Sequence, residues 1–403
     1  MIPLPLANIL HHKLRSGLSA LGVGVGVCML ITLAGLSRGS MREVADRWSG
    51  VQADLIVYPG RWGDNITTLT GAGLDEADAS TVTDLTIGDK RAVEYVVPIY
   101  LYRISIRGTE HNLVGVAPGD LHCLTGGKPL LDGATGLDPD GAFASWLANQ
   151  IEHAGDKVID ISEEELAQHG GLEMVVDARL ARTEKLSLGS TVYTAGHHFK
   201  VVGIAPEGSL ARVMVSRATA EYLFNGSLGR YTLLFVKLKQ GVHIGPAVQA
   251  VGKVRHLAAV PLNEYLGMLE SRFGVIYVYL DTVNGVTMGV AFLFILVTLY
   301  TMVIQHLREI AILKSMGASG WFVMRQVMGE SLLLTAAGTL AGILASWPLS
   351  WTIEYFRPLL TVVILWHWIV VGTVAALGGG LLASIYPAWC ALRTDVVEAL
   401  SLE

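Results

Sequence analysis

The stretch HLREIAILKSMGASG, residues 306–320, determines how the rest of the chain is interpreted. It directly follows an apolar run, residues 283–304, and charged side chains return abruptly at Arg308 and Glu309. Apolar residues continue at helical spacing as far as Gly317, a residue type suited to a helix C-terminus. The pattern predicts a membrane helix that continues beyond the bilayer and ends there.

A second helix is predicted to begin directly after this turn. Ser319 can cap a short helix over residues 321–324, and a new apolar run begins near Val327. The two helices would form an elbow outside the membrane, residues 306–327, between two spans. A membrane hairpin with a polar tip is the alternative that this stretch alone leaves open.

Composition divides the chain into a membrane part and a globular part. The 403 residues are 52% hydrophobic and 16% charged, and the mean hydropathy is +0.48. Soluble domains usually carry about 25% charged residues, so this chain is depleted in charge. The net charge of −6 gives no support to nucleic-acid binding.

Four apolar runs are long enough to cross a bilayer, which takes about 20 residues. Both termini and the elbow are predicted to be cytoplasmic, because an even number of spans returns the chain to one side and basic residues favour that side. The first run is long for a signal peptide and lacks a small-residue cleavage site, so we interpret it as a retained span. The predicted spans are residues 18–38, 281–305, 328–354 and 359–385, followed by a cytoplasmic tail of residues 386–403.

The region between the first two spans, residues 39–280, is predicted to be a large α+β extracytoplasmic domain. Short apolar segments bounded by Gly, Pro and Asp predict strands, with helical patterns between them. Residues 126–171 are rich in Gly, Asp and Glu and interrupt this pattern, which suggests an inserted subdomain. Residues 263–280 predict a helical stalk that leads into the second span. The predicted strands include residues 52–60, 96–99, 102–107 and 113–116, and the predicted helices include residues 74–85, 143–151 and 246–256.

The elbow resembles the signature of MacB/FtsX-like ABC transporter permeases, in the string LREIAILKSMGAS of residues 307–319. The strings RQVMGESLLLTAAGTLAG, residues 325–342, and IYPAWCALRTDVVEAL, residues 385–400, are also similar to motifs of this family. Residues 172–205 resemble the second half of the family's periplasmic domain. The resemblance covers nearly the whole chain and is weakest over residues 126–171.

The resemblance implies several partners and a location. It implies a dimer, formed with itself or with a similar permease, and a separate ABC ATPase subunit that contacts the elbow and the tail. A periplasmic adaptor and membrane lipid are further implied partners, and the implied location is the bacterial inner membrane. Residues 1–17 are similar to an amphipathic segment on the inner membrane face. The residues implied in coupling to the ATPase are Arg308, Glu309, Lys314, Gly317, Ala318, Ser319, Arg325, Pro387, Arg393 and Glu398.

Small residues predict close packing of the membrane helices. Gly22 and Gly26 form a small-xxx-small pair in the first span. Glycine is also common in membrane helices without such a role, so both interpretations of this pair stay open. Gly338 and Gly342 match the family's third helix and complete the predicted packing positions.

The sequence shows no catalytic or metal-binding pattern. No GxxxxGK[ST] phosphate loop occurs, and the nearest string, residues 126–129, lacks the earlier glycine and the hydroxyl. The histidine pairs at residues 11–12 and 197–198 lack the further ligands of a zinc motif. We therefore predict a non-catalytic membrane subunit without a cofactor or metal of its own, with ATP bound by the partner subunit.

The spans are also poor in ionisable groups. No Asp, Glu, Lys or Arg lies between Asp281 and Arg308, whereas ion-coupled carriers usually place such groups at mid-membrane. A proton- or sodium-driven carrier is therefore not expected. The resemblance implies instead that ATP hydrolysis by the partner moves the external domain and drives efflux or release of a substrate that is already outside. Two alternatives stay open, an FtsX-like regulatory protein that controls an extracytoplasmic hydrolase and a lipoprotein-release permease.

Overall fold

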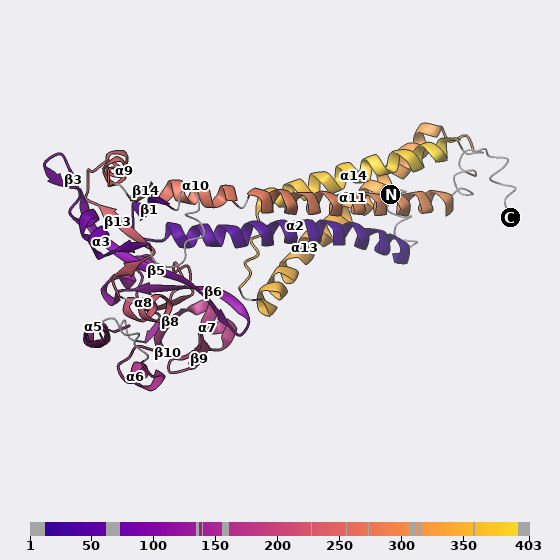
Figure 1. Cartoon of the computed structure of the whole chain (residues 1–403). Coiled ribbons are helices and arrows are strands. Elements are labelled where there is room, and N and C mark those ends of the chain that lie inside the picture. The colour runs from indigo at the N-terminus through magenta and orange to yellow at the C-terminus, as the bar shows by residue number, and fades with distance from the viewer. Residues whose placement is uncertain are drawn as a thin grey trace. The chain divides into compact units, whose positions relative to one another are not determined.

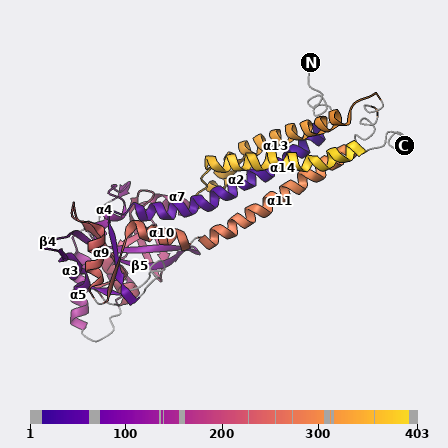
Figure 2. The same cartoon turned by 90° about the horizontal axis from the view of Figure 1, so that it is seen from above.

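The computed structural model of the chain describes residues 13–61, 73–133, 137–138, 140–154, 161–226, 228–254, 256–272, 274–305, 312, 316–357 and 359–393. The chain divides into two compact units (Figures 1 and 2). The helical unit holds Met1–Ser40 and Gly274–Glu403, and the α/β unit holds Met41–Phe273. Helix α2, Lys13–Ser49, contributes to both units, because the boundary falls inside it.

The α/β unit is built on a sheet that has ten strands within the described residues. The strands are β1 (Leu55–Pro59), β5 (Val93–Ile106), β6 (Thr109–Val116), β7 (Asp132–Gly133), β8 (Glu173–Asp177), β9 (Thr191–Thr194), β10 (His197–Ala205), β11 (Val213–Ser216), β13 (Leu233–Leu238) and β14 (Leu257–Pro261). The sheet order is β14-β1-β13-β5-β6-β11-β8-β10-β7, and β9 pairs with β10. Two short pairs lie outside this sheet, β2 (Leu74–Asp75) with β12 (Arg230–Tyr231) and β3 (Thr86–Ile87) with β4 (Lys90–Arg91).

Strand β5 joins the two halves of the sheet. Its first part pairs with β13, for example Val97 with Phe235, and its second part pairs with β6, for example Leu101 with Val114. The sequence predicted two strands here, at residues 96–99 and 102–107, but the chain continues as one strand. Tyr100 is 1% exposed, so burial holds the central residues in the sheet where the local pattern suggested a break.

Helices cover the sheet and are capped by the residue types expected at helix starts. Asp75, Ser162, Asp177 and Ser216 each accept a hydrogen bond from a backbone N–H in the first turn of the helix that follows. The helices of this unit beyond α2 are α3 (Glu76–Thr83), the short α4 (Leu121–Leu124) after a 3-10 turn at Pro118–Asp120, α5 (Ala142–Ala154), α6 (Glu163–Gln168), α7 (Ala178–Glu184), α8 (Arg217–Asn225), α9 (Ile244–Gly252) and α10 (Leu262–Arg272).

The segment predicted to be an inserted subdomain, residues 126–171, packs into the core of the α/β unit. Helices α5 and α6 lie in it, and Phe143, Leu147 and Leu166 are buried in one cluster with strand residues such as Phe199. Strand β7, in the same segment, pairs with β10. The described residues of the predicted inserted subdomain therefore share the core of the α/β unit, because a few well-spaced apolar side chains anchor an otherwise polar segment.

The helical unit contains four long helices among the described residues: α2, α11 (Gly274–Gln305), α13 (Gly320–Phe356) and α14 (Trp366–Arg393). By length and composition, three helices can cross a membrane: Ala20–Ser49, Gly320–Phe356 and Trp366–Tyr386. If the helices Leu262–Leu269 and Gly274–Val290 are taken together as one bent span, the number of candidate spans rises to four. The membrane-helix prediction is confirmed to this extent.

Two local predictions around these helices are corrected. The short helix at residues 321–324 is not separate, since α13 runs without a break from Gly320 to Phe356, although Ser319 does cap it. The fourth span was predicted to begin at residue 359, but residues 359–365 are non-helical and α14 begins at Trp366. The predicted stalk of residues 263–280 falls on α10 and α11, and Phe273 between them lies outside the described residues.

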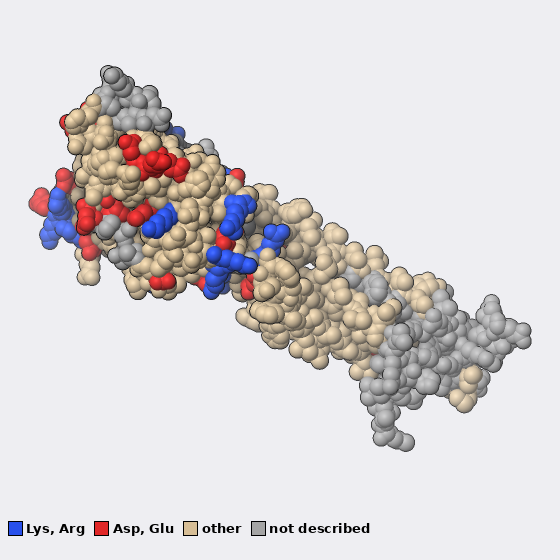
Figure 3. All heavy atoms as spheres, turned by 90° about the horizontal axis from the view of Figure 1, so that it is seen from below, with Lys and Arg blue, Asp and Glu red and all other residues tan. Residues whose placement is uncertain are grey.

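Exposed aromatic side chains mark both ends of α13. Trp321 is 70% exposed near its start, and Trp347 and Trp351 are 56% and 71% exposed near its end. At 1.5 Å per residue, Trp321 and Trp347 lie about 39 Å apart along the helix. Aromatic residues favour the two faces of a bilayer, whose thickness with the headgroups is about 40–45 Å. On the face drawn in Figure 3, the Lys, Arg, Asp and Glu side chains gather on the α/β unit, and the described surface of the helical unit is almost free of them.

Candidate functional site

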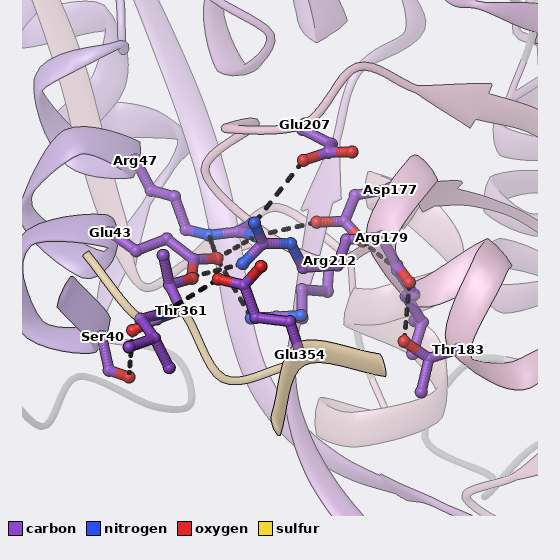
Figure 4. Close-up of polar contacts among 12 residues, drawn as sticks. Ser40, Glu43, Arg47, Asp177, Arg179, Thr183, Glu207, Arg212, Glu354 and Thr361 are labelled. Carbon is purple, nitrogen blue, oxygen red and sulfur yellow. Dashed lines mark hydrogen bonds and ion pairs between the residues drawn. The ribbon is translucent and has the colours of Figure 1, made fainter. Parts of the chain in front are cut away.

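The last two turns of α2 carry charged side chains into the α/β unit. Glu43 is the centre of this group: its Oε1 lies 2.9 Å from Arg47 Nη2 and 3.2 Å from Arg212 Nη2, and its Oε2 lies 2.7 Å from Arg179 Nη1. We call Glu43, Arg47, Asp177, Arg179 and Arg212 the Glu43 cluster (Figure 4). It brings together α2, the start of α7 and the residue before β11.

Arg47 ties the helix to buried parts of the α/β unit. Its Nη2 donates to Asp177 Oδ2 at 2.9 Å, and its Nη1 donates to the carbonyl oxygen of Ser209 at 2.8 Å. Asp177 is 0% exposed, and its Oδ1 also accepts from the N–H of Leu180 as the cap of α7. Removing one partner of such a buried ion pair typically costs about 3–5 kcal/mol, because the other charge stays buried without compensation.

The cluster concentrates positive charge around its carboxylates. Burial lowers the pKa of Arg212, and the neighbouring guanidinium of Arg47 lowers it further, while Asp177 and Glu43 act in the opposite direction. Arg179 also lies 3.6 Å from Glu207 Oε2, so the network extends to the loop after β10. Several acidic and basic groups from distant sequence positions therefore fix the end of α2 together.

His111 on β6 is a neutral neighbour of this network. Its side chain is 5% exposed, and burial followed by the charge of Arg212 lowers its pKa. Its Nε2 has no hydrogen-bond partner within the described residues. A neutral imidazole here adds no further positive charge beside the arginines.

An aromatic contact completes the attachment of α2. The ring of Trp48 lies 4.7 Å from the ring of Tyr265 and 6.1 Å from that of Phe235, between centroids. Tyr265 is 1% exposed on α10, and Phe235 is 0% exposed on β13. Because Trp48 follows Arg47 directly, polar and apolar contacts hold the same turn of the helix.

A second close contact joins α2 to α13 within the helical unit. A Cβ added at Gly342 would stand 2.5 Å from the carbonyl oxygen of Gly24, and one added at Gly338 would stand 2.5 Å from that of Ala20. The two helix backbones therefore approach closely at the glycines of α13. Gly24 lies between the predicted Gly22 and Gly26, and Gly26 lines an apolar cavity of about 470 Å³ with residues of α11 and α14.

The structure places only some of the predicted coupling residues. Gly317 has a φ of +89°, a backbone conformation that favours glycine, and Ser319 caps α13. Ala318 precedes that cap, and Arg325 is exposed on α13. Pro387 and Arg393 lie on α14. Arg308, Glu309, Lys314 and Glu398, and the side chains of Pro387 and Arg393, lie outside the described part of the chain.

Sequence reasoning missed the Glu43 cluster. Its signal was an acid and a base four residues apart, Glu43 and Arg47, directly after an apolar run. The partners Asp177, Arg179 and Arg212 lie 130 or more residues further on, so no local pattern connects them. Within the described residues, no group of three or more His, Cys, Asp or Glu is arranged to hold a metal ion.

Comparison with known families matches most of the chain. The model of the MacB-like periplasmic core domain matches residues 16–254, and that of the FtsX-like permease C-terminal domain matches residues 282–396. The first covers more than half of the 403 residues.

Two relatives and one solved structure are among the proteins that the chain is similar to. The chain is 18% identical to the macrolide export ATP-binding/permease protein MacB of Mannheimia succiniciproducens, over 99% of this chain and 60% of that protein. It is 21% identical to the uncharacterized ABC transporter permease YvrN of Bacillus subtilis, over 100% of this chain and 99% of that protein. The solved periplasmic region of MacB from Actinobacillus actinomycetemcomitans aligns with 55% of this chain and 95% of that chain, at 14% identity and a TM-score of 0.35.

Proposed function

This chain is an ABC transporter permease of the MacB/FtsX family, and we propose that it converts ATP hydrolysis by a separate ATPase subunit into movement of its α/β unit outside the membrane. One observation carries this proposal. Helix α2 continues without a break from its apolar part into the Glu43 cluster, where it is fixed to the α/β unit. A single continuous helix therefore has residues in both units.

We propose four spans, with α11 as the second. The apolar content of α11 and the aromatic residues at both ends of α13 support this count. The elbow and both termini would then lie in the cytoplasm, and the α/β unit outside. The elbow and the C-terminal tail are the surfaces proposed to contact the ATPase, as the resemblance implies.

We propose α2 as the path for force across the unit boundary. Helix α2 keeps its helical hydrogen bonding across the unit boundary at Ser40 and ends in ion pairs and an aromatic contact. Displacement of α2 along its axis would therefore act directly on the loop and helix that Arg47 and Glu43 bind.

The proposed substrate is handled outside the membrane. The described parts of the spans carry few ionisable side chains, of which Glu330 on α13 is 5% exposed, and this scarcity supports handling of the substrate outside the membrane. We propose efflux or release of a substrate from the periplasm or the outer leaflet, in a dimer and with a periplasmic adaptor. Movement of the α/β unit would drive this efflux or release.

Copurification tests this function. The chain, tagged and extracted from its native membrane, is expected to bring a separate ABC ATPase with it, and the complex is expected to hydrolyse ATP. A Glu309→Lys variant is expected to remain in the membrane but to lose stimulation of that ATPase, because it reverses a charge on the elbow. Absence of any ATPase would contradict the proposal, and an extracytoplasmic hydrolase in the complex would favour the regulatory alternative.

A further inference from the structure

The connection between α13 and α14 lies against α2 within the helical unit. We call residues 359–365 the strap. The N–H of Val362 donates to Glu354 Oε1 at 3.1 Å, which holds the strap to the end of α13. Val362 is 8% exposed, so the strap is packed into the unit, although it forms no regular secondary structure.

Two hydrogen bonds join the strap to α2. The N–H of Val363 donates to the carbonyl oxygen of Gly35 at 3.1 Å, and Ser40 Oγ donates to the carbonyl oxygen of Thr361 at 3.4 Å. Gly35 and Ser40 lie five residues apart on α2, so these bonds follow the helix over more than one turn. The strap therefore binds α2 through backbone groups at successive positions.

Two glycines make this contact possible. A Cβ at Gly35 would stand 2.8 Å from the carbonyl oxygen of Val363, and one at Gly39 would stand 2.5 Å from that of Thr361. Both obstacles are backbone atoms, which cannot move aside as a flexible side chain can. Residues four apart share one face of a helix, so Gly35 and Gly39 form a single notch. Each glycine destabilises a helix by about 1 kcal/mol relative to alanine. In return, the notch lets the backbone of the strap approach the backbone of α2.

The notch and the Gly24 contact hold α2 at two levels. Gly24 lies against Gly338 and Gly342 of α13, and Gly35 and Gly39 lie against the strap. The two levels are 11 to 15 residues apart, or about 17–22 Å along the helix. A helix held at one level can tilt or slide, whereas contacts at two levels restrict both.

We propose that the strap is a bracket that fixes α2 to the α13–α14 pair, with Gly35 and Gly39 as the positioning residues. This inference rests on the proposed function: α13 begins at the elbow, so the bracket makes displacement of α13 displace α2 with it. The strap stays on α2 throughout the ATP cycle. Force then reaches the α/β unit along α2, which continues across the unit boundary.

Glycine substitutions test the bracket in the full complex with its copurified ATPase. Gly39→Val forces the strap away from α2, while Gly17→Val is the matched control, because a Cβ at Gly17 on the same helix meets nothing within 4 Å. The readouts are ATP hydrolysis and the ATP-dependent fluorescence change of a dye on Leu131→Cys, whose native side chain is 63% exposed on the α/β unit. The three native cysteines are replaced by alanine in every sample.

The expected result separates the two readouts. Gly39→Val is expected to keep the rate of ATP hydrolysis within about twofold of the parent rate and to reduce the dye response at least fivefold. Gly17→Val is expected to keep both the rate and the response. A variant that merely unfolds would lose both together. A full dye response in Gly39→Val would overturn the bracket while the proposed function stands, whereas no dye response in the parent complex would overturn the proposed function and the bracket with it.

A crosslink decides the question where Gly39→Val does not assemble. Ser40→Cys and Thr361→Cys place two thiols where the strap crosses α2. Because the strap stays on α2, the oxidised pair is expected to keep the dye response of the reduced pair. A response that disappears on oxidation and returns with reductant would show that the strap must leave α2, which contradicts the bracket.

Discussion

Arg47 Nη2 lies 2.9 Å from Asp177 Oδ2, and this buried pair attaches the end of a long helix to the globular part of the chain. The two side chains are 8% and 0% exposed. Asp177 also caps α7, so the same carboxylate holds α2 and orders the helix that follows β8. In the proposed function, axial movement of α2 reaches the α/β unit through this attachment.

Removing the arginine of this pair is expected to destabilise the α/β unit. Arg47→Met leaves Asp177 buried without its cationic partner and should lower the free energy of unfolding by about 3 kcal/mol. Equilibrium urea unfolding of the detergent-solubilised chain measures the change. Arg42→Met is the matched control, since Arg42 is 68% exposed and its contact with Asp46 is worth at most about 1 kcal/mol. Equal effects of the two substitutions would contradict the importance of the buried pair.

Enlarging a glycine at the α2–α13 contact is expected to disturb the helical unit. Gly342→Val places a side chain where the carbonyl oxygen of Gly24 stands 2.5 Å from the Cβ position, and overpacking of this kind typically costs about 1–3 kcal/mol. Thermal unfolding in detergent should show a lower midpoint. Gly378→Val on α14 meets nothing within 4 Å and should leave the midpoint nearly unchanged. A larger drop in the midpoint for Gly378→Val than for Gly342→Val would show that α2 and α13 do not meet at these glycines.

Glu221 is expected to make the stability of the α/β unit depend on pH. It is 2% exposed, and burial raises its pKa from 4.5 to about 7 despite the nearby charge of Arg217. The folded chain holds this proton more tightly than the unfolded chain, so the group's contribution is fully present below pH 4.5 and is lost as the pH rises to about 7.

The size of the effect follows from the shift in pKa, which corresponds to about 3 kcal/mol. Urea unfolding at a series of pH values measures it. In Glu221→Gln, the free energy of unfolding should depend less on pH between 4.5 and about 7, because an amide does not titrate. A wild-type curve that already runs flat, or a variant curve with the same slope, would show that Glu221 titrates normally.

Thiol labelling tests the proposed topology. Single cysteines are introduced as Leu131→Cys in the α/β unit and as Ala318→Cys at the elbow, in a chain without its native cysteines. An impermeant maleimide applied to intact spheroplasts should label position 131 and leave position 318 unlabelled until the membrane is opened. Labelling in the reverse order would place the α/β unit in the cytoplasm and exclude the proposed function.

Local patterns in the sequence predicted the spans and many elements of the α/β unit. Strand β1, helix α3 and the cap at Ser319 were accessible because neighbouring residues define them. The continuity of β5 and the place of α5 in the core were not, because burial by distant segments decides both. The Glu43 cluster was missed for the same reason, since its members come from three separate parts of the sequence. Gly24 was passed over because spacing alone does not tell which glycine faces α13.

In the proposed function, α2 carries movement from the membrane helices to the α/β unit. A flexible Gly-Ser-Gly-Ser insertion after Ser40 interrupts α2 at the unit boundary, and the same insertion after Leu131 in the α/β unit serves as the control. The decisive measurement compares ATP hydrolysis with export or release activity in the purified complex. We predict that the Ser40 insertion keeps the rate of ATP hydrolysis and lowers export at least tenfold, whereas the control insertion keeps both. Export at the parent rate after the Ser40 insertion would contradict transmission through α2.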